Sequence, residues 1–335
     1  MKNIVCSCKD FLKLFDVLHY LLLQKIDNIE VYISDYDHSF KKEYNWITKY
    51  FCLLSNDITF NKGTIDECEN VNDIDITNKN RNVLFTTVCT DNYLPGLKVL
   101  LRSCIKNINN FDYDFRVFYN NDCQSLTNDH KQELLEIYPN IEFEGINEKE
   151  FDIRRGTKPT RLTKNCYLSF YFFKDYGYDY NVFLDCDMIV NRDFTYLLNN
   201  AKDLIGSYDQ NEPKFKPKIW TIYNLTNKRR INSGFIIIDK SYMNEDIFNE
   251  LIEITNNTDL IINNDQCSIN YLIKERKRTV LPYHFNNQVR VCIELEIEDS
   301  PIKDFAYIHH YIGAVKPWMK DKDFSILESE WLKYK

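Results

Sequence analysis

Two aspartates interrupt a strongly apolar stretch of the sequence at a spacing that suits a metal ion. Asp185 and Asp187 stand between the apolar triplets at residues 182–184 and 188–190. Side chains at positions i and i+2 of an extended chain point to the same side, so both carboxylates could bind one hard divalent cation. Burying carboxylates with neither a cation nor hydrogen bonds would cost on the order of several kcal/mol. The pair therefore favours metal binding, with a structural pair of carboxylates as the alternative.

Aspartates at the same spacing also occur in polar or turn-like surroundings, where solvated carboxylates are expected. These pairs are Asp35/Asp37, Asp73/Asp75, Asp112/Asp114 and Asp321/Asp323. The spacing alone therefore indicates little, and the apolar surroundings of residues 185–187 are what distinguish that pair.

A second candidate lies near the C-terminal end, in the segment IHHYIGAVKPW at residues 308–318. It combines His310, whose imidazole could bind a metal, with a glycine that allows a ligand to approach the backbone. Lys316 adds a point charge that could bind a phosphate. By itself the segment is also compatible with a core histidine and a solvated lysine.

Two shorter segments place polar groups at the ends of predicted elements. Asn232 and Ser233 precede a predicted strand in RRINSGFIIID, and Asp265 and Gln266 begin a predicted helix in NNDQCSINYL. An acid and an amide at a helix N-terminus are also good capping residues. For that pair, capping and ligand binding both remain open.

The elements that must position these residues alternate between strands and helices. In the first 60 residues, strands are predicted at 3–6, 29–34 and 57–60, and helices at 10–24 and 40–52. After residue 82 the alternation restarts with strands near 82–89, 114–119 and 141–144, and with helices within 94–107 and 129–137. Such alternation predicts an α/β fold with a mostly parallel sheet, in which ligands bind at the carboxyl ends of strands.

A polar, acid-rich stretch at residues 61–82 separates the two α/β regions. Its composition is typical of a linker or a long surface loop. We therefore expect two domains, a small N-terminal α/β extension with its acidic linker at 1–80 and a larger domain at 81–335.

Composition and charge exclude several classes of protein. The 335 residues include 44% hydrophobic and 27% charged side chains, which indicates a globular protein. A formal net charge of −8 provides no overall cationic field for nucleic acid, so no nucleic-acid partner is expected. Eleven cysteines without CxxC spacing suit reduced thiols in the cytosol. The apolar residues around 17–23 are broken by His19, which is typical neither of a signal peptide nor of a membrane span. A cytoplasmic protein is expected.

Together and in this order, the four motifs resemble those of glycosyltransferase family 8, the group of glycogenin and the lipopolysaccharide galactosyltransferases. The resemblance covers about residues 82–320 and leaves the first 80 residues outside. It implies a GT-A fold, a Rossmann-like mixed sheet that is mostly parallel and flanked by helices. It also implies transfer of a hexose, usually glucose or galactose, from a UDP-sugar with retention of anomeric configuration. The implied cofactor is Mn²⁺, with Mg²⁺ as the alternative.

The resemblance implies a metal and diphosphate site made of residues from two motifs. Asp185, Asp187 and His310 match the metal ligands of the family, and Asp185 also lies near the donor sugar or ribose. Lys316 and the backbone at Gly313 match the groups that hold the diphosphate. Lys316 would then stabilise the leaving group as a fixed cation.

Further matches concern the sugar and the uridine. Asn232, with Ser233 beside it, matches the contact to the donor sugar. Asp265 and Gln266 match the pair beside the sugar, where we expect them to orient it for attack. The resemblance places the uridine at the end of the strand FTTVCTDNY, on Val88, Thr90, Asp91 and Tyr93.

One position departs from the family pattern. The family usually carries Lys or Arg sixteen or seventeen residues before the first aspartate, and the residue sixteen before Asp185 is Ser169. Lys164 or Arg161 could replace this cation only if the segment at residues 175–179 shifts the register. Donor contacts, and with them the choice of sugar, depend on this position.

Three functions remain open. The first is a metal-dependent retaining glycosyltransferase acting on a glycan, a small molecule or a protein, including a tyrosine of its own chain such as Tyr176, Tyr178 or Tyr180. The second is a catalytically silent UDP-sugar-binding or scaffold protein. The third is a nucleotidyltransferase or phosphohydrolase, which explains the aspartates but gives no role to residues 308–318. A homodimer is compatible with each of them.

Overall fold

The computed structural model describes residues 2–26, 28–36, 38–55, 58–63, 68–77, 82–108, 112–123, 126–150, 153, 164–199, 201–209, 230–257, 264–290, 305–319 and 328–335. They belong to two compact units. The smaller unit is Met1–Lys79 with Thr195–Asn200 and Ile297–Phe305, and the larger is Asn80–Phe194 with Ala201–Glu296 and Ala306–Lys335.

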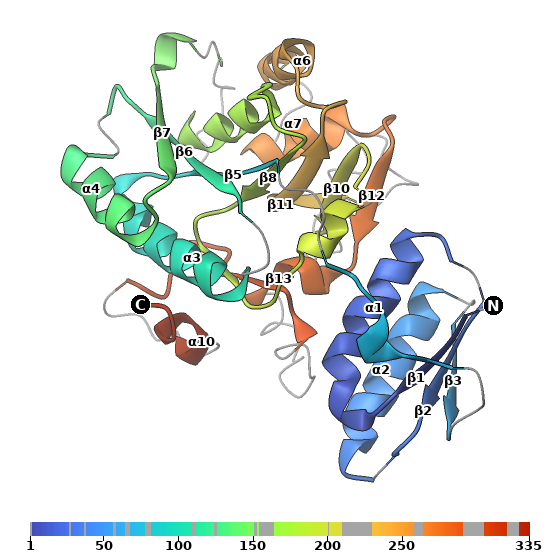
Figure 1. Ribbon diagram of the computed structural model, residues 1–335. Coiled ribbons are helices and arrows are strands. Elements are labelled where there is room, and N and C mark those ends of the chain that lie inside the picture. The colour runs from blue at the N-terminus through green and yellow to red at the C-terminus, as the bar shows by residue number, and fades with distance from the viewer. Residues whose placement is uncertain are drawn as a thin grey trace. The chain divides into compact units, whose positions relative to one another are not determined.

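The smaller unit is a parallel sheet with helical connections (Figure 1). Its strands are β1 (Lys2–Cys6), β2 (Ile29–Ile33), β3 (Ile58–Lys62) and β4 (Glu69–Asn70), in the order β3-β2-β1-β4. The helices α1 (Phe11–Leu23) and α2 (Lys41–Leu54) connect the first three strands. Alternate residues of β2 are buried, as expected for a strand with one packed face. The predicted strand-helix alternation of the first 60 residues is confirmed.

The segment predicted as a linker contributes to this smaller unit. Strand β4 pairs with β1, and Val71 just after it is fully buried. Two segments from far along the chain also belong here: Asn199 donates to the carbonyl of Thr77 at 2.9 Å, and the ring of Phe305 lies 5.1 Å from that of Phe15. The stretch 61–82 is therefore not wholly a linker, because part of it completes the sheet.

The larger unit is built on a seven-stranded sheet in the order β12-β10-β11-β8-β5-β6-β7. Its strands are β5 (Val83–Val88), β6 (Asp114–Asn120), β7 (Ile141–Ile146), β8 (Tyr180–Leu184), β10 (Leu204–Tyr208), β11 (Ile231–Asp239) and β12 (Arg278–Leu281). Strand β11 is antiparallel to both β8 and β10, and the other pairs are parallel. The predicted mixed, mostly parallel sheet is confirmed.

Helices cover both faces of this sheet (Figure 1). On one side lie α3 (Leu94–Asn107) and α4 (Asn128–Ile137), and on the other lie the 3-10 helix η6 (Lys164–Phe173), α6 (Glu245–Asn256) and α7 (Asn264–Leu272). The switch of side follows from right-handed crossovers, since the chain runs outward from β5 to β7 and then returns to the other side of β5. None of the helices that the structure describes has the length and apolar content that a membrane span requires.

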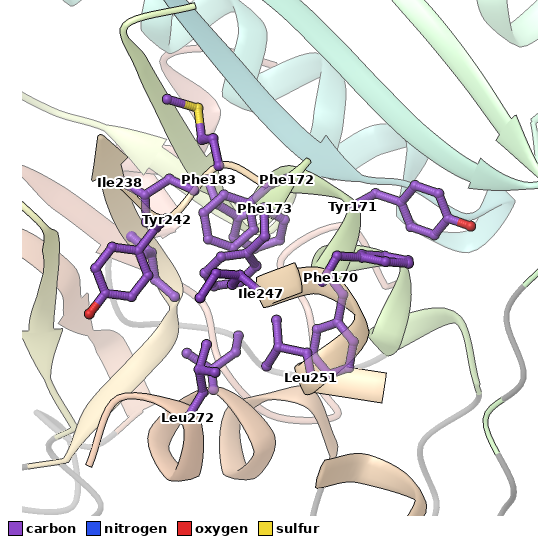
Figure 2. Packing of buried hydrophobic residues seen from close by; sticks show 14 of the residues in the cluster. Phe170, Tyr171, Phe172, Phe173, Phe183, Ile238, Tyr242, Ile247, Leu251 and Leu272 are labelled. Carbon is purple, nitrogen blue, oxygen red and sulfur yellow. The ribbon is translucent and has the colours of Figure 1, made fainter. Parts of the chain in front are cut away.

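A large apolar cluster fills the space between η6, α6, α7 and the sheet (Figure 2). Phe170, Phe172, Phe173 and Phe183 are almost completely buried in it. This packing fixes η6 against the sheet, and η6 carries Ser169 on its buried side.

A small second sheet holds the predicted metal ligands close together. It consists of β9 (Met188–Val190), β13 (Asn287–Gln288) and β14 (Ile308–His310), in the order β13-β14-β9. Strands β9 and β14 are antiparallel, with His310 opposite Met188. This pairing brings a residue from the C-terminal end of the sequence next to Asp187.

The C-terminal helix α10 (Glu328–Leu332) packs under the loop that follows β14. The ring of Trp331 lies 5.1 Å from that of Trp318 and 5.3 Å from that of Tyr311, and 2% of Trp331 is exposed. We expect Trp331→Ala to lower the free energy of unfolding by about 3–5 kcal/mol, the usual loss for a buried aromatic side chain. Denaturant titration measures the change. Leu332→Ala is the matched control, because Leu332 is 52% exposed and should change stability by less than about 0.5 kcal/mol; equal losses in the two variants would contradict the packing role.

Candidate active site and metal site

The three predicted metal ligands meet at the carboxyl end of β8. Asp185 follows β8, Asp187 precedes β9, and His310 ends β14. His310 Nε2 lies 3.4 Å from Asp185 Oδ2 and 3.2 Å from Asp187 Oδ1. One ligand atom from each residue lies within 4.8 Å of the other two. Two carboxylates and an imidazole are a donor set that suits Mn²⁺ or a similar divalent cation.

Gly234 makes room for this cluster. A Cβ atom at that position would lie 2.5 Å from His310 Cε1 and 2.7 Å from Asp185 Oδ2. The backbone of Gly234 also accepts a hydrogen bond from the Asp185 amide at 2.9 Å. The glycine of the Asn-Ser-Gly segment is therefore required by the close approach of β11 to the three predicted metal ligands.

The pKa values of the two carboxylates in the cluster are shifted in opposite directions. Burial would raise the pKa of Asp187, but the ammonium of Lys316 and the imidazole of His310 hold that pKa well below its ordinary value. For Asp185, desolvation raises the pKa, the charge of Asp187 adds to the rise, and His310 opposes it. Two neighbouring carboxylates resist being ionised together. A divalent cation between them would relieve this repulsion.

Lys316 is the buried cation beside the cluster, with 3% of the residue exposed. Its ammonium forms an ion pair with Asp187 and donates to the carbonyl of Tyr311 at 2.8 Å. Burial would lower the pKa of Lys316, but the charge of Asp187 outweighs burial and the pKa is raised. The side chain is therefore charged, and it lies next to the proposed metal position.

The turn after β5 packs against the Lys316 loop. Tyr93 ends a 3-10 helix at Asp91–Tyr93, and its ring centroid lies 5.4 Å from the Lys316 Nζ. The indole N–H of Trp318 donates a hydrogen bond to the backbone carbonyl of Asn92 in this turn at 3.0 Å. The backbone carbonyl of Thr90 accepts a hydrogen bond from the backbone N–H of Tyr93 at 2.8 Å. The predicted uridine turn and the predicted phosphate loop are therefore neighbours.

Val88 and Asp91 are the two other residues predicted to bind the uridine, and no contact with the Lys316 loop is described for either of them. Val88 ends β5 and is half-buried against the aromatic core of the larger unit. The backbone of Asp91 begins the 3-10 helix, and its side chain lies outside the described atoms.

The sequence analysis missed a cation beside Gly313. Gly313 has a φ of +96°, which favours glycine, and a Cβ there would lie 2.9 Å from Nη1 of Arg290. Arg290 is the second residue after β13, and it lies outside the four sequence motifs. Its guanidinium is next to the backbone predicted to hold the diphosphate.

The residues predicted to contact the sugar form one hydrogen-bonded group. The Asn232 amide donates to Gln266 Oε1 at 2.9 Å, and the backbone N–H of Ser233 donates to the same oxygen at 3.2 Å. Asn232 and Ser233 lie within β11, directly after its first residue, and not before the strand as predicted. Gln266 lies in the first turn of α7. The two shorter motifs of the sequence are therefore in direct contact.

Three residues that sequence reasoning did not single out complete this group. Gln266 Nε2 donates to Asp209 at 3.0 Å, and Arg230 Nε lies 3.4 Å from the same carboxylate. Asn286 donates to Asn232 Oδ1 at 2.7 Å and lies 3.0 Å from His310 Nδ1. Asp209 and Arg230 adjoin the ends of β10 and β11, whose pairing no local pattern predicts.

The position that departs from the family pattern lies in the site. Ser169 is 3.1 Å from Asp265 Oδ2, and both residues are buried. Burial, together with the charge of Asp185, raises the pKa of Asp265 to about 7. Lys164 begins the same helix, η6, and Arg161 lies outside the described residues. The family pattern has Lys or Arg at this position. In this protein the hydroxyl of Ser169 contacts Asp265 instead.

The three tyrosines considered as acceptors have hydroxyls that contact neighbours. Tyr178 donates to Asp114 at 2.7 Å, Tyr180 donates to the carbonyl of Ala201 at 3.3 Å, and Tyr176 donates to Glu144 at 3.4 Å. The Tyr176 ring also lies 3.9 Å from the Arg116 guanidinium. These contacts favour packing roles for all three.

Comparison with known proteins gives matches of one kind. The sequence model described as Glycosyl transferase family 8 matches residues 85–322. A curated protein, "Probable glycosyl transferase Gly" of Streptococcus gordonii, is 30% identical over 158 residues, which are 46% of this chain and 21% of that protein. The chain therefore spans about a fifth of the length of that relative.

Solved structures agree on the fold. The galactosyltransferase LgtC, in complex with donor and acceptor sugar analogs, matches with a TM-score of 0.61 and 18% identity over 75% of this chain and 94% of LgtC. The apo structure of the bifunctional glycosyltransferase WbbM gives a TM-score of 0.54 and 16% identity over 97% of this chain and 62% of WbbM. GlyE of Streptococcus pneumoniae TIGR4 gives 0.51 and 18% over 76% of this chain and 60% of GlyE. The predicted GT-A fold is confirmed.

Proposed function

The chain belongs to glycosyl transferase family 8, and from this we propose that it is a metal-dependent glycosyltransferase that transfers a hexose from a UDP-sugar with retention of configuration. The observation that carries the proposal is the convergence of Asp185, Asp187 and His310 beside the buried ammonium of Lys316. Glucose is the proposed sugar and galactose the next candidate. Mn²⁺ is the proposed cofactor, with Mg²⁺ as the alternative.

The proposed donor site runs from the uridine turn to the sugar group. Tyr93, with Val88, Thr90 and Asp91, would bind the uridine, and Lys316 and the Gly313 backbone would hold the diphosphate. A cation bound to the three ligands would act as a Lewis acid on the departing diphosphate. Lys316 would add a fixed positive charge where negative charge accumulates. Arg290 is a further candidate for binding the diphosphate because it adjoins Gly313.

We propose attack on the same face as the departing diphosphate. Gln266 is a poor nucleophile, and its amide is held by Asn232, Ser233 and Asp209. In this route the bond from the anomeric carbon to the diphosphate oxygen breaks, the acceptor oxygen bonds to that carbon, and the acceptor proton passes to the departing diphosphate. Asp265 and Gln266 would orient the sugar and stabilise its positive charge.

The acceptor is proposed to be a hydroxyl of a separate glycan. LgtC, whose fold this chain shares, was crystallised with donor and acceptor sugar analogs. The hydroxyls of Tyr176, Tyr178 and Tyr180 already contact neighbouring residues, which supports an external acceptor over self-modification.

We also propose a cytoplasmic location. The cysteines that the structure describes are free thiols, which is typical of proteins in a reducing compartment.

A panel of UDP-sugars tests the proposed function. With Mn²⁺ and a mixture of glycan acceptors, we expect release of UDP from UDP-glucose or UDP-galactose and a product heavier by one hexose. Product NMR should show the anomeric configuration of the donor. Release of UMP or phosphate would favour a nucleotidyltransferase or phosphohydrolase, and stabilisation by UDP without turnover would favour a silent binding protein. The intact mass of the protein, measured in the same reaction, should stay unchanged if it does not modify itself.

A further inference from the structure

The protonation of the His310 ring decides whether it can bind a cation. Its Nε2 faces Asp185 and Asp187 at 3.4 and 3.2 Å, and its Nδ1 lies 3.0 Å from Asn286 Oδ1. A neutral imidazole carries one proton, and only the nitrogen without it can bind a metal. The neighbouring carboxylates are acceptors, so by themselves they would draw the proton to Nε2 and block metal binding.

The orientation of Asn286 opposes this outcome. The backbone N–H of Gly234, which can only donate, lies 3.0 Å from Asn232 Oδ1 and so identifies that atom as an oxygen. Asn286 approaches the same oxygen at 2.7 Å and must present its Nδ2 there. Turning the Asn286 amide over would place two oxygens in contact in a fully buried position. The carbonyl of Asn286 therefore faces His310 and can only accept a proton from Nδ1.

The orientation of Asn232 has a second, independent anchor. Its Nδ2 donates to Gln266 Oε1, which also accepts from the backbone N–H of Ser233. At the other end of the amide, Gln266 Nε2 donates to the carboxylate of Asp209, which is ion-paired with Arg230. A backbone donor and an ionised acceptor thus fix Gln266 from both sides, and Gln266 in turn fixes Asn232.

We propose that Asn286 is a positioning residue for the candidate metal ligand His310, and that the hydrogen-bonded series Asp209, Gln266, Asn232 and Asn286 keeps Nδ1 of His310 protonated. Nε2, which faces Asp185 and Asp187, is then the ring nitrogen that can bind a cation. Each hydrogen bond in this series has a donor and an acceptor that the neighbouring groups fix, so no ligand is needed to hold the Nδ1 proton in place. The proposal deepens the proposed function, and its consequence for metal affinity rests on that function.

The tautomer can be measured without a metal or a substrate. In metal-free protein with ¹⁵N-labelled histidine, we expect the His310 signal of a protonated Nδ1. The His310→Gln variant assigns these signals by their loss. An unprotonated Nδ1 in the wild-type spectrum would overturn the proposal, whatever the protein's activity. If the expected tautomer is present but no divalent cation binds, the proposed function fails and the assignment of the proton to Nδ1 stands.

Substitution of Asn286 tests its contribution to metal affinity. Asn286→Leu removes the acceptor, and we expect the Kd for Mn²⁺, measured by electron paramagnetic resonance, to rise about 10- to 100-fold. Asn286→Asp keeps an acceptor for Nδ1–H and should bind Mn²⁺ within about threefold of wild type. A Kd unchanged in a folded Asn286→Leu variant would contradict the proposal, and the wild-type spectrum decides if that variant does not fold.

The chain offers a matched control one residue away. Asn287 is also buried, and its side chain lies 3.1 Å from Nδ1 of His309, the neighbour of the metal ligand. Asn287→Leu removes the same chemical group from the next residue, the first of β13, and should leave the Kd for Mn²⁺ within about twofold of wild type. Equal weakening by both leucine substitutions would show a general packing effect and would overturn the specific role of Asn286.

Discussion

Asp187→Asn should reduce Mn²⁺-dependent release of UDP from the donor at least about 10³-fold. Loss of one preorganised electrostatic group typically costs about 10² to 10³ in rate, and Asp187 in addition binds the cation itself. The substitution also removes the charge that balances the buried ammonium of Lys316. Asparagine keeps the size of the side chain, so the effect reports the charge. UDP release measured over a Mn²⁺ titration gives the result.

A second pair of aspartates in the chain provides the control for Asp187. Asp73 and Asp75 have the same spacing but are exposed in the smaller unit. Asp73→Asn should leave UDP release and its dependence on Mn²⁺ unchanged. Full activity of Asp187→Asn at saturating Mn²⁺ would remove the basis for the metal site, and electron paramagnetic resonance would show whether the ion still binds.

The sequence was sufficient to predict the elements whose signal is local. Strand-helix alternation predicted the mostly parallel sheet, and the apolar residues around Asp185 and Asp187 distinguished them from aspartates in polar segments. The segment at residues 308–318 suggested His310 as a metal ligand, and the resemblance to the family matched it to the same ligand set as the aspartates. The antiparallel pairing of β14 with β9 explains why it meets them.

The residues that local patterns could not predict are those placed by long-range pairing. Asp209 and Asn286 lie outside the four motifs, and an asparagine or aspartate near a strand end usually indicates a turn. Arg230 lies within the segment RRINSGFIIID, but nothing local marks it as a partner of Asp209. Their role appears only once β10, β11 and α7 are side by side. Strand β4 was missed for a different reason, because its two polar residues have no β propensity to detect.

Ser169 stands where the family pattern has Lys or Arg, and the sequence alone was sufficient to identify this difference. It could not predict which residue Ser169 contacts. In the structure, Ser169 contacts Asp265, whose pKa is raised by burial to about 7. Asp265 therefore has a neutral hydroxyl beside it at the position where the family pattern implies a cation.

Lys316→Ala should slow turnover by about 10² to 10³ while Mn²⁺ still binds. At 4 Å and an effective dielectric constant of 20, a pair of unit charges interacts by about 4 kcal/mol before desolvation, enough for an effect of this size. The ammonium is already buried and held by Asp187 and the Tyr311 carbonyl, so little reorganisation is needed when negative charge develops on the diphosphate. Since the metal ligands remain, the loss should appear in kcat more than in the Kd for Mn²⁺.

Two further variants separate the charge of Lys316 from its packing. Lys316→Met keeps most of the stem without the ammonium, and it should be as slow as Lys316→Ala if the charge is what matters. Lys240→Ala removes an exposed lysine of the same unit, one paired with Asp179, and should turn over at the wild-type rate. Recovery of wild-type turnover by Lys316→Met would show that the side chain acts by filling space. The diphosphate would then need its fixed cation elsewhere, and Arg290 beside Gly313 is a candidate.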